Sequence, residues 1–225
     1  WIASYDGGTI VDGTGKITVN NPAAISALKM ARGWIGGISP KGVLSYGEEE
    51  ARGVFQTGNA VFMRNWPYAW AAVNNADSPI KGKVGAMPLP RDGPDTRHAA
   101  ALGGQQLAVS KYSVNQAAAI DLVLYLTGKK EQKRRALVGS YNPTLRSLYK
   151  DPEILAKNPF QGLLYNTFVN ATPRPSTVTR GRYNQVSSEF WNTVYTVIGE
   201  GEDPAASLKS LDRKLRRISA HGSWQ

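Results

Sequence analysis

An α/β fold is the class that the sequence predicts, on three observations. Short apolar runs that suit buried strands, such as Ala60–Met63, alternate with longer stretches that have helical periodicity. The 23 glycines and 13 prolines punctuate the chain into separate elements. A hydrophobic fraction of 41% over 225 residues is sufficient to build one large or two small domains.

The composition excludes several classes of site. The chain has no cysteine, so disulfides, thiolate nucleophiles, zinc–cysteine sites and iron–sulfur clusters are ruled out. The net charge of +10 is compatible with a nucleic-acid partner, an anionic surface, or one part of a charge-balanced protein. The basic residues are scattered, and their two densest groups, Lys129–Arg135 and Arg213–Arg217, lie on amphipathic helical patterns. Without an aromatic-rich basic motif, the sequence gives no support for nucleic-acid binding.

The first residues indicate a fragment. The chain has no initiating methionine and opens on Trp1–Tyr5, which looks like the end of a helix already under way. We therefore expect a longer protein. No apolar run is long enough to span a bilayer.

The first third of the chain predicts a hairpin and two helices. The hairpin pairs Thr9–Val11 with Lys16–Val19 around Asp12–Gly15. Asn21-Pro22 supplies an N-cap followed by a proline at the first helical position, and Gly36-Gly37 is the stop signal. Glu48–Glu50 opens the next helix, where carboxylates favour the positive end of the helix dipole. That account of the acidic trio is preferred to a catalytic or metal role.

Asn59–Trp70 is the segment with the strongest functional signal. The apolar run Ala60–Met63 predicts a buried strand, and Pro67 then ends it and directs Trp66 into an extended conformation. Three rings, Trp66, Tyr68 and Trp70, follow the strand, at the end where open α/β sheets bind ligands. Flat rings suit the apolar faces of sugars, although the same rings are also suited to filling a core.

The rest of the chain predicts two strands and a series of helices. The strands are Val84–Pro90 and Leu102–Val109. The last two helices have clear apolar stripes, formed by Tyr183, Val186, Phe190, Val194 and Val197 in one and by Leu208, Leu211 and Leu215 in the other. The expected helices cover 69–75, 113–127, 130–138, a short one from 151, 160–169, 183–198 and 204–218.

Catalytic chemistry is missing from the sequence. The only two histidines, His98 and His221, are far apart and have no metal-ligand spacing. There is no Gly-x-Ser-x-Gly elbow, and no paired carboxylates stand in an aromatic context. We therefore expect a binding protein with no catalytic residue, no metal and no cofactor, and not an enzyme.

The segment Gly58–Trp70 resembles the strand and aromatic loop of the extracellular solute-binding proteins of ABC sugar importers. The resemblance continues in order through Gly82–Pro90, Leu102–Ser110, Ala118–Leu126, Gly139–Leu148 and Pro173–Trp191, and so covers nearly the whole chain. The nearest subgroup is the trehalose/maltose or related α-glucoside binders.

This resemblance implies a type II periplasmic-binding-protein fold, in which two α/β lobes joined by hinge strands hold a sugar in the cleft between them. The family is nearly twice this length, so the chain would be the C-terminal part, with the first lobe mostly missing. Residues 1–85 and 149–225 would then belong to the second lobe and residues 86–148 to the first. Val84–Met87 and Tyr141–Leu145 would be the hinge crossings.

The resemblance also implies ligand-binding residues. Trp66 and Tyr68 match sugar-stacking aromatics, and Gly103 and Gly104 match a glycine pair whose backbone meets the sugar. Gln105 stands where these binders often have tryptophan, a departure that would shift specificity towards a more polar or larger ligand. Arg174 matches an arginine between prolines that binds sugar hydroxyls. Trp191 matches a region that supplies an aromatic, with a core role as the alternative. Acidic residues that grip the sugar would lie in the missing part.

The implied function is capture of a sugar, such as the α-glucosides trehalose or maltose, for delivery to the permease subunits of an ABC importer. Such a protein would be a monomer in the periplasm or outside the cell, with or without a lipid anchor. The alternatives are the same fold binding a polyol, an oligosaccharide or an anionic ligand, and a carbohydrate-active enzyme.

Overall fold

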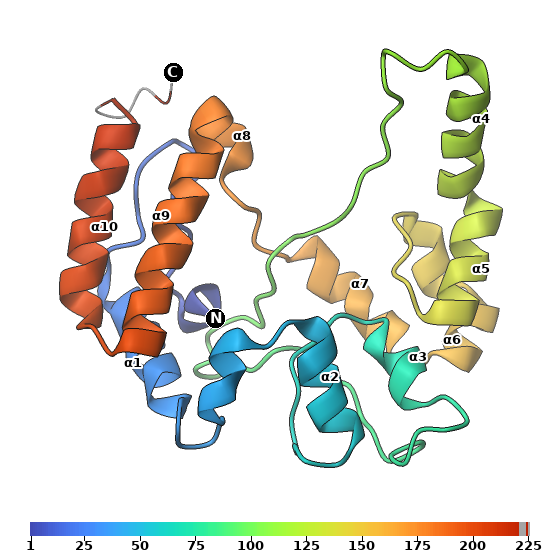
Figure 1. Ribbon diagram of the computed structural model, residues 1–225, viewed down its shortest axis with the longest axis horizontal. Coiled ribbons are helices and arrows are strands. Elements are labelled where there is room, and N and C mark those ends of the chain that lie inside the picture. Colours follow the sequence, from blue (N-terminus) through green and yellow to red (C-terminus); the bar gives the residue numbers. More distant parts are fainter. Residues whose placement is uncertain (221–223, 225) are drawn as a thin grey trace. The chain divides into compact units, whose positions relative to one another are not determined.

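A computed structural model describes residues 1–220 and 224 and shows helices joined by long irregular segments (Figure 1). It divides into two compact units, each made of segments separated in the sequence. Unit 1 comprises Trp1–Ser45, Leu89–Leu102 and Asn170–Gln225, and unit 2 comprises Tyr46–Pro88 and Gly103–Val169. The predicted lobes, 1–85, 86–148 and 149–225, concern a longer protein and stay a prediction. His221 lies outside the described residues.

Unit 1 is organised around three helices, α1 (Pro22–Trp34), α9 (Tyr183–Tyr195) and α10 (Pro204–Ile218). In Figure 1, α9 and α10 lie side by side, and their contact is the largest between elements of this unit. The remaining elements of the unit are short: η1 (Ile2–Tyr5), η2 (Lys41–Ser45), α8 (Ser176–Thr179), η4 (Arg180–Arg182) and the π-helical turn η5 (Thr196–Glu200).

The core of unit 1 confirms the apolar stripes of the last two helices. Leu208, Leu211 and Leu215 of α10 have no solvent exposure. Val186 of α9 and Val197 of η5 are equally buried, and Phe190 and Val194 pack against the same cluster. The hairpin and α1 supply the opposite side through Val11, Val19, Ala24 and Leu28. Apolar side chains removed from water in this way are the main stabilising contribution to the unit.

Capping side chains fix the starts of α1 and α10, and the cap at Asn21 is the one that the sequence predicts. The Asn21 side chain accepts a hydrogen bond from the Ala24 amide at 2.9 Å, while its own amide nitrogen donates to the carbonyls of Gly7 and Thr18. One residue thus joins the start of α1 to the hairpin. At α10, the Asp203 carboxylate accepts from the Ala206 amide at 2.8 Å.

Unit 2 contains the other helices: α2 (Glu48–Gln56), α3 (Ala69–Val73), α4 (Gln116–Thr127), α5 (Lys129–Gly139), η3 (Arg146–Lys150), α6 (Pro152–Lys157) and α7 (Gln161–Val169). All of the α-helices among them were predicted to within a few residues. A small core of Ala136, Leu148 and Ile154 joins α5, η3 and α6. Trp70 of α3 packs against Phe160, with ring centroids 4.8 Å apart.

The predicted strands are wrong for the described residues. Ala60–Met63, Val84–Pro90 and Leu102–Val109 are irregular, and the hairpin keeps a single antiparallel bridge, Val11 with Ile17. Val61 and Phe62 are 83% and 86% exposed instead of buried. A strand needs a neighbour to satisfy its backbone N–H and C=O groups. Among the described residues, the backbone bonds of these three segments to another segment are limited to the one from the Leu102 amide to the Thr172 carbonyl, at 2.8 Å beside the bridge of Ala101 with Thr172.

Helix α4 is the other exposed apolar element. It has no buried side chain, although Ile120, Leu122, Leu124 and Tyr125 are all large and apolar. Within unit 2 its main contact is with α5, which follows it in the chain (Figure 1). No helix of the described residues is long and apolar enough to cross a membrane.

Candidate functional site

The candidate site is the aromatic loop, defined here as Asn65–Trp70, in unit 2. An irregular segment from residue 59 leads into it, and α3 begins at its Ala69. Ala69 and Val73 are buried, and Trp70 packs on Phe160, so the start of α3 anchors this end of the loop. Trp66 is 40% exposed, and Tyr68 is partly buried. Of the three predicted rings, Trp70 therefore has the packing role, while Trp66 and Tyr68 reach the surface.

The acidic start of α2 holds the two surface rings by their polar edges. The Trp66 indole Nε1 donates a hydrogen bond to Glu48 Oε1 at 3.1 Å. The Tyr68 hydroxyl donates to Glu49 Oε1 at 2.5 Å. The Asn65 side chain adds a third link, because its Nδ2 donates to the Glu48 carbonyl at 3.0 Å. An indole and a phenol bonded at the edge keep their flat faces available for apolar contact.

Two arginines balance part of this negative charge. Arg52 bonds Glu49 through its guanidinium, with Nε 3.1 Å from Oε2. The guanidinium carbon of Arg64 lies 6.0 Å from the centre of the Trp66 ring, within range of a cation–π interaction. The site thus combines rings, carboxylates and guanidinium groups, which are the groups that bind the apolar faces and hydroxyls of a neutral sugar.

The hydrogen bonds shift two pKa values in opposite directions. Arg52, and then Tyr68, lower the pKa of the Glu49 carboxyl, because both donate hydrogen bonds to its ionised form. The bond to Glu49 raises the pKa of the Tyr68 hydroxyl, since losing the proton would place two anions side by side. At neutral pH, Glu49 is therefore the acceptor and Tyr68 the donor.

Glu48 and Glu49 were not predicted as site residues. Their carboxylates do stand at the first turn of a helix, as the acidic trio predicts, and Glu50 closes that turn by accepting from the Gly47 amide at 2.9 Å. Glu48 and Glu49 also bond Trp66 and Tyr68, which lie 18 and 19 residues further along the chain. This tertiary contact does not follow from the preference of carboxylates for the start of a helix.

The other predicted residues are not joined to the aromatic loop. Gly103, Gly104 and Gln105 belong to an irregular segment of unit 2, and a Cβ atom placed on Gly104 would meet no described atom within 4 Å. Contact between this backbone and a sugar stays a prediction.

Arg174 and Trp191 belong to unit 1. Arg174 is exposed in the loop before α8, and in the described part of the chain its guanidinium has no hydrogen-bond or ion-pair partner. Trp191 on α9 is 57% exposed, so it is not part of the core of unit 1, and its contact with a sugar stays a prediction. Among the described residues, no group of three or more acidic or histidine side chains could hold a metal ion.

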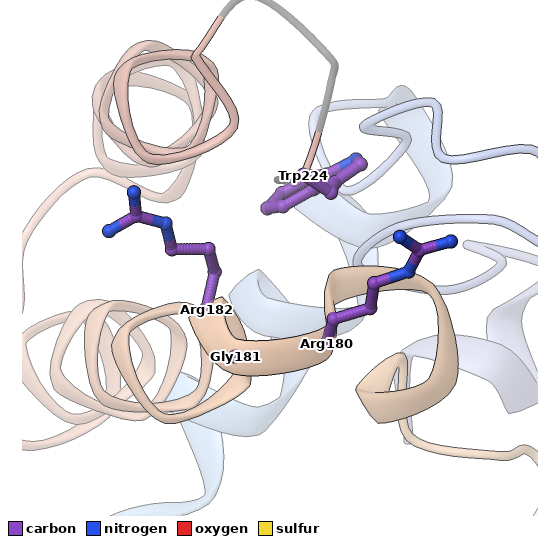
Figure 2. A pocket seen from close by; sticks show the side chains of 4 residues that line it. All are labelled: Arg180, Gly181, Arg182 and Trp224. Carbon is purple, nitrogen blue, oxygen red and sulfur yellow. The ribbon is translucent and has the colours of Figure 1, made fainter.

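Unit 1 also carries a shallow surface hollow of about 490 Å³. Figure 2 shows Arg180 and Arg182 on either side of the Trp224 ring in that view. The Trp224 indole donates a hydrogen bond to the Gly15 carbonyl at 2.8 Å, which ties this ring to the hairpin. None of the predicted site residues lines it.

The chain is similar in sequence to known transport proteins. The profile described as bacterial extracellular solute-binding protein matches residues 2–133. A probable ABC transporter-binding protein of Deinococcus radiodurans is 54% identical over 222 residues, which are 99% of this chain and 53% of that protein. The chain therefore spans about half the length of this relative.

Two solved structures have the same fold. Maltose-bound MalE3 of T. maritima is 39% identical with a TM-score of 0.88, over 96% of this chain and 55% of that one. An ABC transporter solute-binding protein from Agrobacterium radiobacter K84, in complex with ribitol, is 23% identical with a TM-score of 0.79, over 97% of this chain and 55% of that one. The predicted fold class, that of the type II periplasmic binding proteins, is thereby confirmed, and the chain carries about half of it.

Proposed function

Because the chain belongs to the family of bacterial extracellular solute-binding proteins, we propose that its protein is the substrate-binding component of an ABC importer for a sugar. It would act in the periplasm or outside the cell and deliver its ligand to permease subunits in the membrane. Members of this family bind solutes and are not enzymes, so the carbohydrate-active enzyme is no longer an alternative.

The observation that carries the sugar proposal is the pair of surface rings held by carboxylates. Trp66 and Tyr68 offer flat apolar faces, while Glu48 and Glu49 bond their edges. Sugar rings present apolar C–H faces surrounded by hydroxyls, and a site of this composition matches both parts. Arg174, whose guanidinium is unengaged among the described residues, would add charge-assisted hydrogen bonds to hydroxyls.

The transport step would depend on closure of two lobes. A ligand that contacts both lobes binds the closed state more tightly and so shifts the equilibrium towards it. In this proposal, Trp66, Tyr68, Arg174 and Trp191 contact the ligand from the second lobe of the longer protein, and Gly103, Gly104 and Gln105 contact it from the first lobe. The closed, monomeric form would be the one that the permease recognises.

The ligand we propose is an α-glucoside disaccharide such as maltose or trehalose. The support is the maltose-bound relative at 39% identity. Polyols and oligosaccharides are the alternatives, because the same fold accommodates ribitol in a more distant protein and Gln105 replaces a frequent tryptophan. An anionic ligand is favoured by the net charge of +10 but disfavoured by Glu48 and Glu49 beside the rings.

Calorimetric titration of the protein at its full natural length tests this proposal. We expect maltose or trehalose to bind and sucrose, ribitol and gluconate to bind more weakly.

Trp66→Ala should weaken binding about tenfold, because an aromatic contact contributes about 0.5–1.5 kcal/mol beyond its buried area. The matched control is Tyr112→Ala, which removes an 81% exposed ring elsewhere in unit 2 and should leave the affinity unchanged. Binding of gluconate alone would overturn the neutral-sugar proposal.

A further inference from the structure

The surface rings of the aromatic loop have little packing of their own to hold them. The chain from residue 59 to Trp66 is irregular, and Trp66 is 40% exposed. A side chain that is free to change rotamer loses conformational entropy when a ligand fixes it, and this loss weakens binding. What fixes the rings before a ligand arrives therefore contributes to affinity.

Glu48 fixes the indole through two separate contacts. Its Oε1 accepts the one hydrogen bond that an indole can donate, from Trp66 Nε1 at 3.1 Å. Its backbone carbonyl accepts from the neighbouring Asn65 side chain at 3.0 Å. The Asn65 side chain and the edge of the Trp66 ring are thus both attached to the first turn of α2.

Glu49 does the same for the phenol, and it is itself held in place. Tyr68 donates to Glu49 Oε1 at 2.5 Å, and Arg52 donates to Glu49 Oε2 at 3.1 Å. Each carboxylate oxygen therefore has its own donor. Since the rotamer of Glu49 is fixed by Arg52 from within α2, the orientation of Tyr68 is tied to the helix and not to solvent.

Glu50 provides an internal comparison. It belongs to the same helical turn and carries the same charge, but its Oε2 accepts from the Gly47 amide at 2.9 Å and contacts neither ring. The three carboxylates thus separate into two that bond rings and one that caps the helix.

We propose that Glu48 and Glu49 are positioning residues, which orient Trp66 and Tyr68 so that their faces are preorganised for the sugar. The carboxylates act through the rings and are not themselves a ligand site. This inference rests on the proposed function, because preorganisation matters only if the rings bind a ligand.

The first test compares alanine with glutamine at each position. Glutamine keeps an oxygen that accepts from the indole or the phenol, whereas alanine does not. Maltose titration of the full-length protein should show about three- to tenfold weaker binding for Glu48→Ala and Glu49→Ala, the range of one lost hydrogen bond. Glu48→Gln should stay within about twofold of the unaltered protein, since the bond from the indole is kept. Glu49→Gln keeps one acceptor oxygen for two donors, Tyr68 and Arg52, and should fall between Glu49→Ala and the unaltered protein.

Glu50 supplies the control for this test. Glu50→Ala removes the same charge without touching a ring and should leave maltose affinity unchanged. Equal affinity of the alanine variants and the unaltered protein would overturn positioning. A Glu48→Gln variant as weak as Glu48→Ala would also overturn it, because charge and not bond acceptance would then be responsible.

A spectroscopic measurement separates failure of this inference from failure of the sugar proposal. In sugar-free protein labelled with 5-fluorotryptophan, the Trp66 resonance is identified by its loss in Trp66→Phe. Glu48→Ala should shift or broaden that resonance, while Glu48→Gln and Glu50→Ala should leave it in place. An unchanged resonance in Glu48→Ala would refute positioning whether or not maltose binds. If Glu48→Ala shifts the Trp66 resonance but the unaltered protein binds no sugar, only the proposed sugar-binding function would be refuted.

Discussion

Glu131 on α5 is a carboxylate that is only 4% exposed and is surrounded by donors. Arg134 bonds both of its oxygens, at 2.8 and 2.7 Å, and Arg135 bonds one at 3.0 Å. These bonds, chiefly the one from Arg134, lower the pKa of Glu131 from 4.5 to about 2. A buried charge of this kind is tolerated because each oxygen is paired.

The depressed pKa of Glu131 predicts a pH-dependent contribution to stability. A carboxyl whose pKa falls on folding stabilises the folded state above its unfolded pKa, and loses that contribution as the pH falls from about 4.5 to about 2. We expect Glu131→Gln to have a lower thermal midpoint than the unaltered protein at pH 7. The difference between the two should shrink towards pH 3. Thermal melts across this range measure it, and a difference independent of pH would contradict the assignment.

At the residue scale, local chemistry could be predicted and tertiary partners could not. The caps Asn21 and Asp151 follow from residue type and position, and both accept hydrogen bonds as expected. For Trp66, Tyr68 and Trp70 the sequence left surface and core roles open, and the structure separates them, with Trp70 packed on Phe160 and Trp66 40% exposed. The bonds to Glu48 and Glu49 span 18 and 19 residues, and no spacing rule in the sequence brings these groups together.

At the element scale, helices were predictable because their hydrogen bonds lie within one segment. The apolar stripes of α9 and α10 fix both their extent and their buried face. Strands depend on a partner segment, so an apolar run such as Ala60–Met63 has strand character without forming a strand in the described residues. Its side chains at Val61 and Phe62 remain in solvent.

The buried stripe of α10 predicts a large effect for a single truncation. Leu211 has no solvent exposure, so Leu211→Ala should reduce the free energy of unfolding by about 2–5 kcal/mol through lost burial and the resulting cavity. Urea denaturation measures the change. Arg213→Ala, on the exposed face two residues later, should alter it by no more than about 0.5 kcal/mol. Similar values for the two variants would mean that α10 does not pack as described.

At the scale of the whole molecule, the exposed apolar surface of α4 and the greater length of the relatives both indicate that further chain covers this helix. Four large apolar side chains of α4, those of Ile120, Leu122, Leu124 and Tyr125, are 49% to 63% exposed, although a helix that is apolar on every side is ordinarily buried. The relatives are about twice as long as this chain. We expect the remainder of the protein to cover α4 and to supply the partners that the three predicted strands lack.

This expectation can be tested by comparing two lengths of the protein. The 225-residue chain alone should bind a hydrophobic dye such as ANS strongly, and the protein at full natural length should bind it weakly. Leu122→Glu combined with Leu124→Glu should reduce dye binding by the short form and lower the thermal midpoint of the long form. The control is Lys130→Glu on the neighbouring α5, an exposed polar position where both readouts should stay unchanged. A full-length protein that tolerates the double change as well as the control would show that α4 is not covered.

The segmented construction of unit 1 has a consequence for the order of events during synthesis. Its core joins Val11, Val19 and Leu28 to Leu208, Leu211 and Leu215, and the whole of unit 2 is translated in between. At about 5–20 residues per second, the ribosome needs roughly 10–40 s to travel from Leu28 to Leu208. Through this interval α1 has no α10 to pack against. Unit 1 must therefore be the later of the two to complete its fold. If the ribosome stalls within unit 2, the first segment of unit 1 stays without its packing partner.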